Sequence, residues 1–302
     1  MLRNLSTKET YADLALIATA IVWGATFLPM ATATQTNGVF TLLFWRFLIA
    51  CFIMAFIAFK FDKKFDINSI KYGLILGVIL FFGFASQTFA FKFAQSANVA
   101  FISGLNVVIV PFVVYAFFRE RISIYAYIGV ALGCIGLYFL SDPSVSFGKG
   151  EALSIVCAFA WAFHIVFTSF YAKKCELFTL LATQFGVIIV LSAIFAFAFE
   201  DGITPNLDYA FYKAMVISIL FATIFGFIMQ ATMLKLTTPV KAALIFTLEP
   251  VSAGVLGYFA GGEMFGVWQI LGALIILAGI LISEIGTILQ KNSCAKTQAV
   301  HV

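Results

Sequence analysis

Charged residues are scarce in this chain. Asp, Glu, Lys and Arg make up 11% of its 302 residues, and the mean hydropathy is +1.06. A soluble domain carries about 25% charged residues. With 63% hydrophobic residues, the chain has more apolar surface than a water-facing domain can bury, so lipid must solvate it. We therefore predict an all-α membrane protein, and the net charge of +4 gives no reason to expect a nucleic-acid partner.

Cysteine is also sparse, and the five cysteines show no CxxC or other metal-ligand spacing. Three of them lie inside apolar stretches, where ordinary packing is the expected role. The sequence has no GxxxxGK[ST] nucleotide loop, no nucleophilic triad and no cluster of His, Asp and Glu. We therefore expect no metal, no cofactor and no enzyme activity, which disfavours both an ATP-driven pump and a lipid-modifying enzyme.

Apolar stretches occupy most of the chain. A helix needs about 20 apolar residues to cross a bilayer core of about 30 Å, and ten such stretches are present. They cover residues 12–33, 39–59, 71–92, 97–118, 122–140, 150–171, 177–199, 211–235, 240–260 and 266–289. Short polar tails precede and follow them at 1–11 and 290–302. Ala31-Thr32-Ala33 resembles a signal-peptide cleavage site, but span 12–33 has a counterpart at 150–171, so we expect it to be retained.

The sequence repeats itself. Phe82-Gly83-Phe84 recurs in the second half of the chain as Phe225-Gly226-Phe227. Further matches at this spacing, or at a slightly shorter spacing before a small insertion, are Thr41/Thr179, Gln87/Gln230, Glu120/Glu263, Gly129/Gly272 and Gly136/Gly279. Residues 12–140 and 150–289 thus hold five predicted spans each. Because five is odd, we predict two inverted-topology five-helix repeats, the construction of alternating-access carriers whose substrate site lies at the midplane.

Lys and Arg are distributed unevenly between the two sides of the predicted bundle. Fourteen lie in the tails and loops of one side: Arg3, Lys8, Lys60, Lys63, Lys64, Lys71, Arg119, Arg121, Lys173, Lys174, Lys235, Lys241, Lys291 and Lys296. Only Lys92, Lys149 and Lys213 fall on the other side. Because loops rich in Lys and Arg stay in the cytoplasm, we predict a multi-pass protein of the cytoplasmic (inner) membrane with both termini inside.

Glu249 is the clearest functional candidate inside the membrane. It lies about ten residues, roughly 15 Å, into the ninth predicted span, and Pro250 beside it frees a backbone carbonyl one turn earlier. A charge in the hydrocarbon is costly, so this carboxyl is expected to bind an ammonium group or take up a proton; a structural carboxyl is the alternative. Asn106, its counterpart in the repeat, either lines the same site or makes a helix–helix hydrogen bond.

Two tryptophans and their neighbours are further candidates. Trp23 and Trp161 are counterparts near the midplane, although tryptophan favours the membrane interfaces, and His164 lies on the same helical face as Trp161. Indole walls suit a small amphipathic molecule or an amine, but bundle packing gives the same pattern. Gln87 and Gln230 are also counterparts, suited either to lining a gate or to bonding neighbouring helices.

Other polar residues are expected to be structural. Arg46 lies about eight residues into the second span, and its counterpart is the neutral Gln184; snorkelling or pairing with a carboxyl is favoured over contact with a substrate anion. Glu120 and Glu263 precede the fifth and tenth spans, where a carboxylate stabilises a helix N-terminus. Glycines with GxxxG spacing permit close helix packing, so we expect a monomer or a weak dimer.

These residues resemble the drug/metabolite transporter superfamily, in particular its ten-helix EamA-type members. The resemblance covers residues 12–289 and rests on Phe44-Trp45-Arg46-Phe47, on Leu248-Glu249-Pro250-Val251, on the glutamate before the last helix of each repeat, and on glycine-rich repeat ends. The first repeat departs from the pattern, because its proline is Pro111 and Val107 is aligned with Pro250. The resemblance implies a cytoplasmic-membrane carrier, mostly exporting amino acids or related metabolites, with a central cavity built by helices 1, 3, 4, 6, 8 and 9.

We therefore expect a secondary transporter that exports a small amino-acid-like metabolite by alternating access. The expected substrate-binding residues are Trp23, Gln87, Asn106, Trp161, His164, Gln230 and Glu249. The alternative is an uptake carrier of the same fold for a nucleoside-like or other metabolite, since the repeat makes both access states similar. A non-transporting scaffold is disfavoured because it has no need for polar counterparts at the midplane.

Overall fold

The computed structural model describes residues 2–62, 66–119, 123–140, 148–237, 239–279, 281–282 and 286, and within these ranges all regular secondary structure is helical. The helices are α1 (Leu2–Ala33), α2 (Val39–Phe61), α3 (Ile67–Ala90), α4 (Ser96–Ser103), α5 (Asn106–Phe118), α6 (Ile124–Leu140), α7 (Lys149–Tyr171), α8 (Leu177–Phe199), α9 (Tyr209–Val216), the π-helix η1 (Ile217–Phe225), α10 (Gly226–Met233), α11 (Pro239–Phe246), α12 (Leu248–Gly261) and an apolar helix over Val267–Gly279. The predicted all-α class is confirmed.

The helices form ten segments, as the hydropathy pattern predicted. Seven are long and apolar enough to cross a membrane: Tyr11–Ala33, Val39–Phe61, Ile67–Ala90, Ser96–Phe118, Lys149–Tyr171, Leu177–Phe199 and Tyr209–Met233. The others hold α6, the pair α11 and α12, and the Val267–Gly279 helix. Because α1 already begins at Leu2, most of the predicted tail 1–11 is helical. The predicted tail 290–302 lies outside the described residues.

Helix α3 begins at a capping residue that extends it beyond its apolar stretch. Predicted span 71–92 begins earlier in the structure, at Ile67, because the Asp66 carboxylate accepts hydrogen bonds from the N–H groups of Asn68 and Ser69, each at 3.1 Å. These are donors that the first turn of a helix leaves without backbone partners. A single aspartate therefore extends α3 by one turn beyond its apolar stretch.

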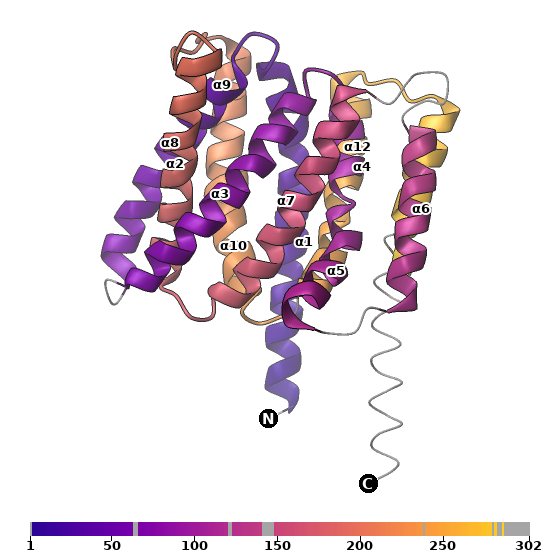
Figure 1. Ribbon diagram of the computed structural model, residues 1–302, viewed down its shortest axis with the longest axis horizontal. Coiled ribbons are helices and arrows are strands. Elements are labelled where there is room, and N and C mark those ends of the chain that lie inside the picture. Colours follow the sequence, from indigo (N-terminus) through magenta and orange to yellow (C-terminus); the bar gives the residue numbers. More distant parts are fainter. Residues whose placement is uncertain are drawn as a thin grey trace.

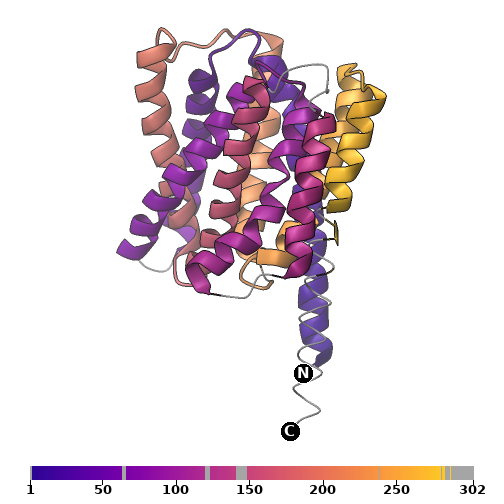
Figure 2. The ribbon, with the colours of Figure 1, turned by 45° about the vertical axis from the view of Figure 1, so that its right-hand side comes forward.

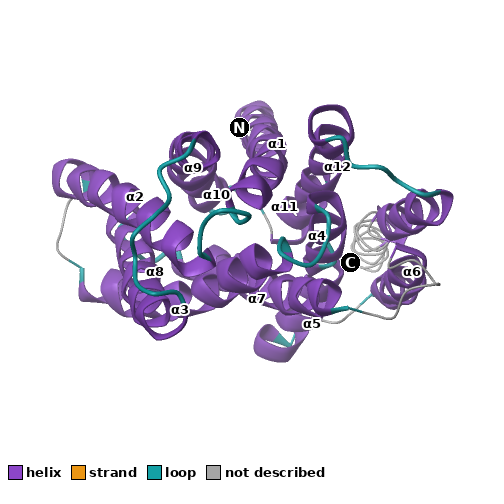
Figure 3. Cartoon of the chain, turned by 90° about the horizontal axis from the view of Figure 1, so that it is seen from above, coloured by secondary structure: helices purple, strands orange, loops and turns teal. Residues whose placement is uncertain are grey.

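The segments pack in two layers. Viewed from above, α1, α2, α9, α10 and α12 lie in one layer, and α3, α5, α7 and α8 lie in the other (Figure 3). Helices α2 and α8 stand together at one end of the bundle, and α6 stands at the opposite end (Figures 1 and 2). Helices α1, α3, α7 and α10 occupy the middle, which places the counterpart helices α1 and α7 near each other at the centre of the molecule.

Helices α2 and α8 are counterparts in the repeat and lie antiparallel. Asp62, at the end of α2, accepts hydrogen bonds from the first turn of α8, at Phe178 and Thr179. Glu200, at the end of α8, accepts from the first turn of α2. Each helix therefore starts where its counterpart ends, which is the arrangement that an inverted repeat predicts.

Two segments are interrupted at matching positions. Helix α4 stops at Ser103 and α5 starts at Asn106, while α11 stops at Phe246 and α12 starts at Leu248. The prolines do not match: Pro111 lies inside α5, whereas Pro250 lies in the first turn of α12, where no backbone N–H needs a helical partner. The interruptions are therefore shared by both repeats even though only the second has a proline beside its break.

Glu263 connects the two repeats on one face. Its carboxylate accepts hydrogen bonds from the N–H and hydroxyl of Ser96, at 2.9 and 2.5 Å, and from the N–H of Ala97 at 3.2 Å. Because Ser96 begins α4, Glu263 has the predicted structural role at a helix N-terminus, and that helix belongs to the other repeat. A carboxylate stabilises whichever helix N-terminus is near in space, and the sequence does not specify which one that is. Its counterpart Glu120 lies outside the described residues.

Candidate functional site

A small cavity lies where the two repeats meet. Its lining residues are Trp23, Thr26, Phe27, Met30, Arg46, Phe84, Gln87, Thr88, Phe91, Trp161, Ala222 and Glu249. The cavity is small, with a volume of about 20 Å³, which is room for about one water molecule. The structure therefore shows a small central site lined by both aromatic and polar side chains.

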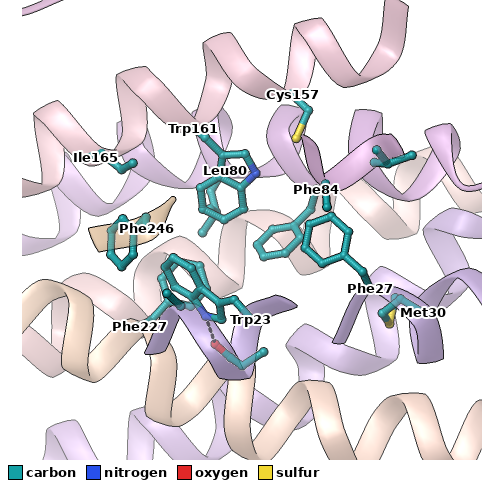
Figure 4. Packing of buried hydrophobic residues seen from close by; sticks show 14 of the residues in the cluster. Trp23, Phe27, Met30, Leu80, Phe84, Cys157, Trp161, Ile165, Phe227 and Phe246 are labelled. Atoms are coloured by element: carbon teal, nitrogen blue, oxygen red, sulfur yellow. Dashed lines mark hydrogen bonds between the residues drawn. The ribbon is translucent and has the colours of Figure 1, made fainter. Parts of the chain in front are cut away.

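Trp23 and Trp161 form one wall of the cavity. Their ring centroids lie 5.8 Å apart. The Trp23 indole N–H donates to the carbonyl of Ala222 at 2.9 Å (Figure 4), and a Cβ at Gly226 would collide with that indole nitrogen. Trp161 Nε1 has no oxygen or nitrogen partner among the described residues. The second repeat thus holds Trp23 in two ways: Gly226 leaves room for the indole, and the Ala222 carbonyl in η1 accepts its N–H. Trp161 is held by packing.

Six aromatic side chains, three from each repeat, fill the centre of the molecule, and we call them the aromatic septum. They are Trp23, Phe47, Phe84, Trp161, Phe185 and Phe227. Each ring contacts its own counterpart, at 5.8 Å for the tryptophans, 5.4 Å for Phe47 and Phe185, and 6.1 Å for Phe84 and Phe227. Aromatic pairs at these separations attract one another beyond the effect of burial. The septum therefore lies at the junction of the two repeats.

Arg46 brings a positive charge to the cavity. Its side chain is only 4% exposed, so the snorkelling expected from the sequence does not occur. The guanidinium carbon lies 4.6 Å from the ring centroid of Phe84, a cation–π contact, and Nε donates to the hydroxyl of Thr223 at 2.8 Å. That hydroxyl donates in turn to the carbonyl of Ser218 in η1. The Nε hydrogen bond thus orients the guanidinium, and its two Nη groups are left for a different acceptor.

Glu249 brings a carboxylate to the same cavity. It is the second residue of α12, where free backbone N–H groups favour negative charge, and its side chain is partly exposed toward the cavity that it lines. Gly24 permits this placement, because a Cβ there would collide with Ser252 and with the backbone of Glu249 itself. The Glu249 carboxyl group therefore reaches the central cavity from the start of α12.

The remaining predicted residues are buried away from the cavity lining. His164 is 1% exposed, and its Nε2 lies 2.9 Å from the amide oxygen of Gln184. Gln230 is fully buried, with neither amide atom bonded to a described residue. Asn106 donates from Nδ2 to the carbonyl of Ser103 at 2.9 Å. Thus Trp23, Gln87, Trp161 and Glu249 share one cavity, while the other three predicted residues lie outside its lining.

Sequence reasoning missed several lining residues. Besides Arg46, they are Thr26, Phe27, Met30, Phe84, Thr88, Phe91 and Ala222. A signal was present on α3, where Phe84, Gln87, Thr88 and Phe91 have the spacing of one helical face. If Gln87 is predicted to line the cavity, the residues on the same face of α3 are predicted to line it as well. No comparable signal marks Ala222, which contributes through its backbone carbonyl.

Comparison with known proteins gives consistent matches. The EamA-like transporter family pattern matches residues 10–142 and 148–284. An uncharacterized transporter of Archaeoglobus fulgidus is 30% identical, covering 91% of this chain and 86% of that protein. The uncharacterized inner membrane transporter YedA of Escherichia coli is 23% identical, covering 89% of each chain. A solved structure at 17% identity superposes with a TM-score of 0.68, covering 90% of this chain and 98% of that chain, and it shows the fold alone.

Proposed function

Since the chain belongs to the EamA-like transporter family, we propose that it carries a small amino-acid-like metabolite out of the cytoplasm by alternating access. Family membership makes it a multi-pass membrane transporter and not an enzyme. The proposal adds the class of substrate, one with both an ammonium and a carboxylate group, and the direction of movement. Residues 12–140 and 150–289 are proposed as the two bodies that move against each other.

The observation that carries the proposal is that Arg46 and Glu249 line the same cavity. A zwitterion satisfies both, because its carboxylate can accept two hydrogen bonds from a guanidinium and its ammonium can donate to the carboxylate of Glu249. The indole faces of Trp23 and Trp161 add cation–π attraction for the ammonium group. A purely cationic or anionic molecule leaves one buried charge without a partner, which is costly.

The shape of the cavity supports alternating access. Its lining comes from both repeats, so a movement of one repeat against the other changes its access. On α1 the lining runs from Trp23 to Met30, towards the helix end that we predict to face outwards. The breaks between α4 and α5 and between α11 and α12 supply flexible points at the depth of Glu249. These features support an outward exit from a central site.

The test is a transport assay with purified protein in liposomes. Liposomes are loaded with amino acids, their N-acetyl and methyl-ester derivatives, and a nucleoside as representative of the alternative substrate class. We expect efflux of free amino acids and at least about tenfold less efflux of either derivative, because each removes one charge-assisted contact. Transport of the nucleoside but of no amino acid would favour the uptake carrier for a nucleoside-like metabolite.

Glu249→Gln separates charge from shape in the same assay. If Glu249 holds the ammonium, we expect KM to rise by about tenfold or more while residual flux keeps its response to pH. If Glu249 carries a proton during the cycle, flux loses its dependence on a pH gradient while binding persists. The control is Asp201→Asn, because Asp201 is an exposed loop residue with φ of 53°, a conformation that asparagine tolerates. Wild-type flux at all pH values in correctly inserted Glu249→Gln protein would rule out both roles.

A further inference from the structure

The repeat relates the cavity lining to a second group of polar residues. The cavity-lining residues Thr26, Arg46 and Gln87 have His164, Gln184 and Gln230 as their counterparts in the second repeat. None of these three counterparts lines the cavity. We call them the inner polar group. The approximate two-fold axis therefore places them on the opposite side of the aromatic septum.

The inner polar group is buried without being satisfied. His164 is 1% exposed, and Gln184 and Gln230 are fully buried. His164 Nδ1, Gln184 Nε2 and both amide atoms of Gln230 have no hydrogen-bond partner among the described residues. Burying a polar atom without a partner is unfavourable, and native proteins do so rarely. Four such atoms in one group therefore point to a partner that is absent from this conformation.

The aromatic septum separates this group from the cavity. The His164 ring lies 5.8 Å from the rings of both Trp161 and Phe227. Figure 4 shows Phe27 and Met30 together on one side of the tryptophan pair. Both belong to the cavity lining. The inner polar group is closed off from solvent in this structure, since His164 is 1% exposed and Gln184 and Gln230 are fully buried.

We propose that His164, Gln184 and Gln230 line a second substrate chamber, which opens to the cytoplasm in the opposite access state and is closed in this one. This inference rests on the proposed transport function and names the residues that receive the substrate on the inner side. The amide oxygens accept hydrogen bonds from the substrate ammonium, and the amide N–H groups donate to its carboxylate. Because Gln184 is the counterpart of Arg46 in the repeat, the chamber binds by hydrogen bonds without a fixed positive charge.

The competing explanation is a polar cluster that only packs helices together. The two explanations differ at Gln230, whose side-chain amide makes no hydrogen bond with the described residues. If it only packs, Gln230→Leu removes two unsatisfied atoms and leaves transport unchanged. If it lines the chamber, the same variant loses a substrate contact, and we expect transport to fall by about tenfold with no loss of stability.

The decisive experiment measures access from each side of the membrane. Gln230→Cys and its matched counterpart Gln87→Cys are made in a transport-active background whose native cysteines are replaced. Each is treated with a positively charged, membrane-impermeant methanethiosulfonate in right-side-out and in inside-out vesicles. We expect Gln87→Cys to react faster from outside and Gln230→Cys to react faster from the cytoplasmic side, and transported amino acids to slow both reactions.

Several results would overturn the inference. They are a Gln230→Cys protein that transports but reacts from neither side, one that reacts only from outside, and a Gln230→Leu protein with wild-type flux. Ser192→Ala is the control for burial, since Ser192 is also fully buried with an unpaired hydroxyl but lies outside both polar groups; its transport should be unchanged. Cytoplasmic reaction of Gln230→Cys without transport of any amino acid would uphold the chamber and reject the proposed substrate class.

Discussion

Asp62 and Glu200, which occupy equivalent positions in the two repeats, hold each other's helices by the same set of hydrogen bonds. Asp62 accepts from the N–H and hydroxyl of Thr179 at 2.7 and 2.6 Å. Glu200 accepts from the N–H and hydroxyl of the counterpart Thr41 at 2.9 and 3.3 Å. Hydrogen bonds therefore join α2 to α8 at both ends of the pair. By contrast, α4–α5 and α11–α12 are each interrupted along their length.

Removing either of these carboxylate caps should loosen the α2–α8 pair. We expect Asp62→Asn and Glu200→Gln each to lower the free energy of unfolding by about 1–2 kcal/mol, because a charged acceptor for helix N–H groups becomes neutral. The two sites lie at opposite ends of a helix of 23 residues, so the effects should add in the double variant. Denaturant unfolding in detergent measures the effects, with Asp201→Asn as the exposed control. Wild-type stability in all variants would show that the caps contribute nothing.

Two helical glycines should respond oppositely to alanine. A Cβ at Gly24 would lie 2.9 Å from the backbone nitrogen of Ala253 and closer still to Ser252 Oγ, whereas a Cβ at Gly186 meets nothing within 4 Å. We expect Gly24→Ala to cost about 1–3 kcal/mol by forcing α1 away from α12, and to reduce transport. Gly186→Ala should stabilise α8 by about 0.5–1 kcal/mol. Thermal unfolding of the two variants side by side tests this, and equal melting temperatures would contradict it.

Acid stability should depend on Asp66, which precedes α3 outside the membrane-spanning segments. The Ser69 hydroxyl, with the N–H groups of Asn68 and Ser69, lowers the pKa of Asp66 below its ordinary value of 3.8, against a smaller opposing effect of burial. A lowered folded-state pKa gives stability that is present above the ordinary pKa and is lost as the pH falls through the folded-state pKa. We expect Asp66→Asn to be less stable than wild type at about pH 6, and this difference to shrink towards about pH 3. Melting curves across this range measure it, and a pH-independent difference would exclude the carboxylate as the cause.

Both termini should face the cytoplasm. The expectation rests on fourteen Lys and Arg residues on one side against three on the other. A fluorescent protein that matures only in the cytoplasm should be bright at the C-terminus, and a phosphatase active only outside should be active within loop 201–208. A dark C-terminal fusion together with an inactive loop fusion would reverse the orientation and exchange the two faces of the carrier.

Much of the architecture could be predicted from the sequence because its signals are local. The length of each apolar stretch set the ten segments, and the regular spacing between matching motifs related the repeats. Glu249 stood out for a physical reason, since a carboxylate near the midplane is rare, and the structure places it on the central cavity. For Arg46 the sequence left the surroundings open, because a long basic side chain can reach either lipid headgroups or an interior cavity. Only its neighbours Phe84 and Thr223 decide between the two.

The sequence by itself determined which positions are equivalent, and only the tertiary structure decided how equivalent positions differ. Arg46 lines a cavity while its counterpart Gln184 is fully buried, and Trp23 bonds a carbonyl while Trp161 has no such partner. A repeated sequence imposes an approximate two-fold axis. In a close-packed interior, however, equivalent side chains meet different neighbours. The asymmetry is therefore a property of the packing around each residue, which the repeated sequence does not specify.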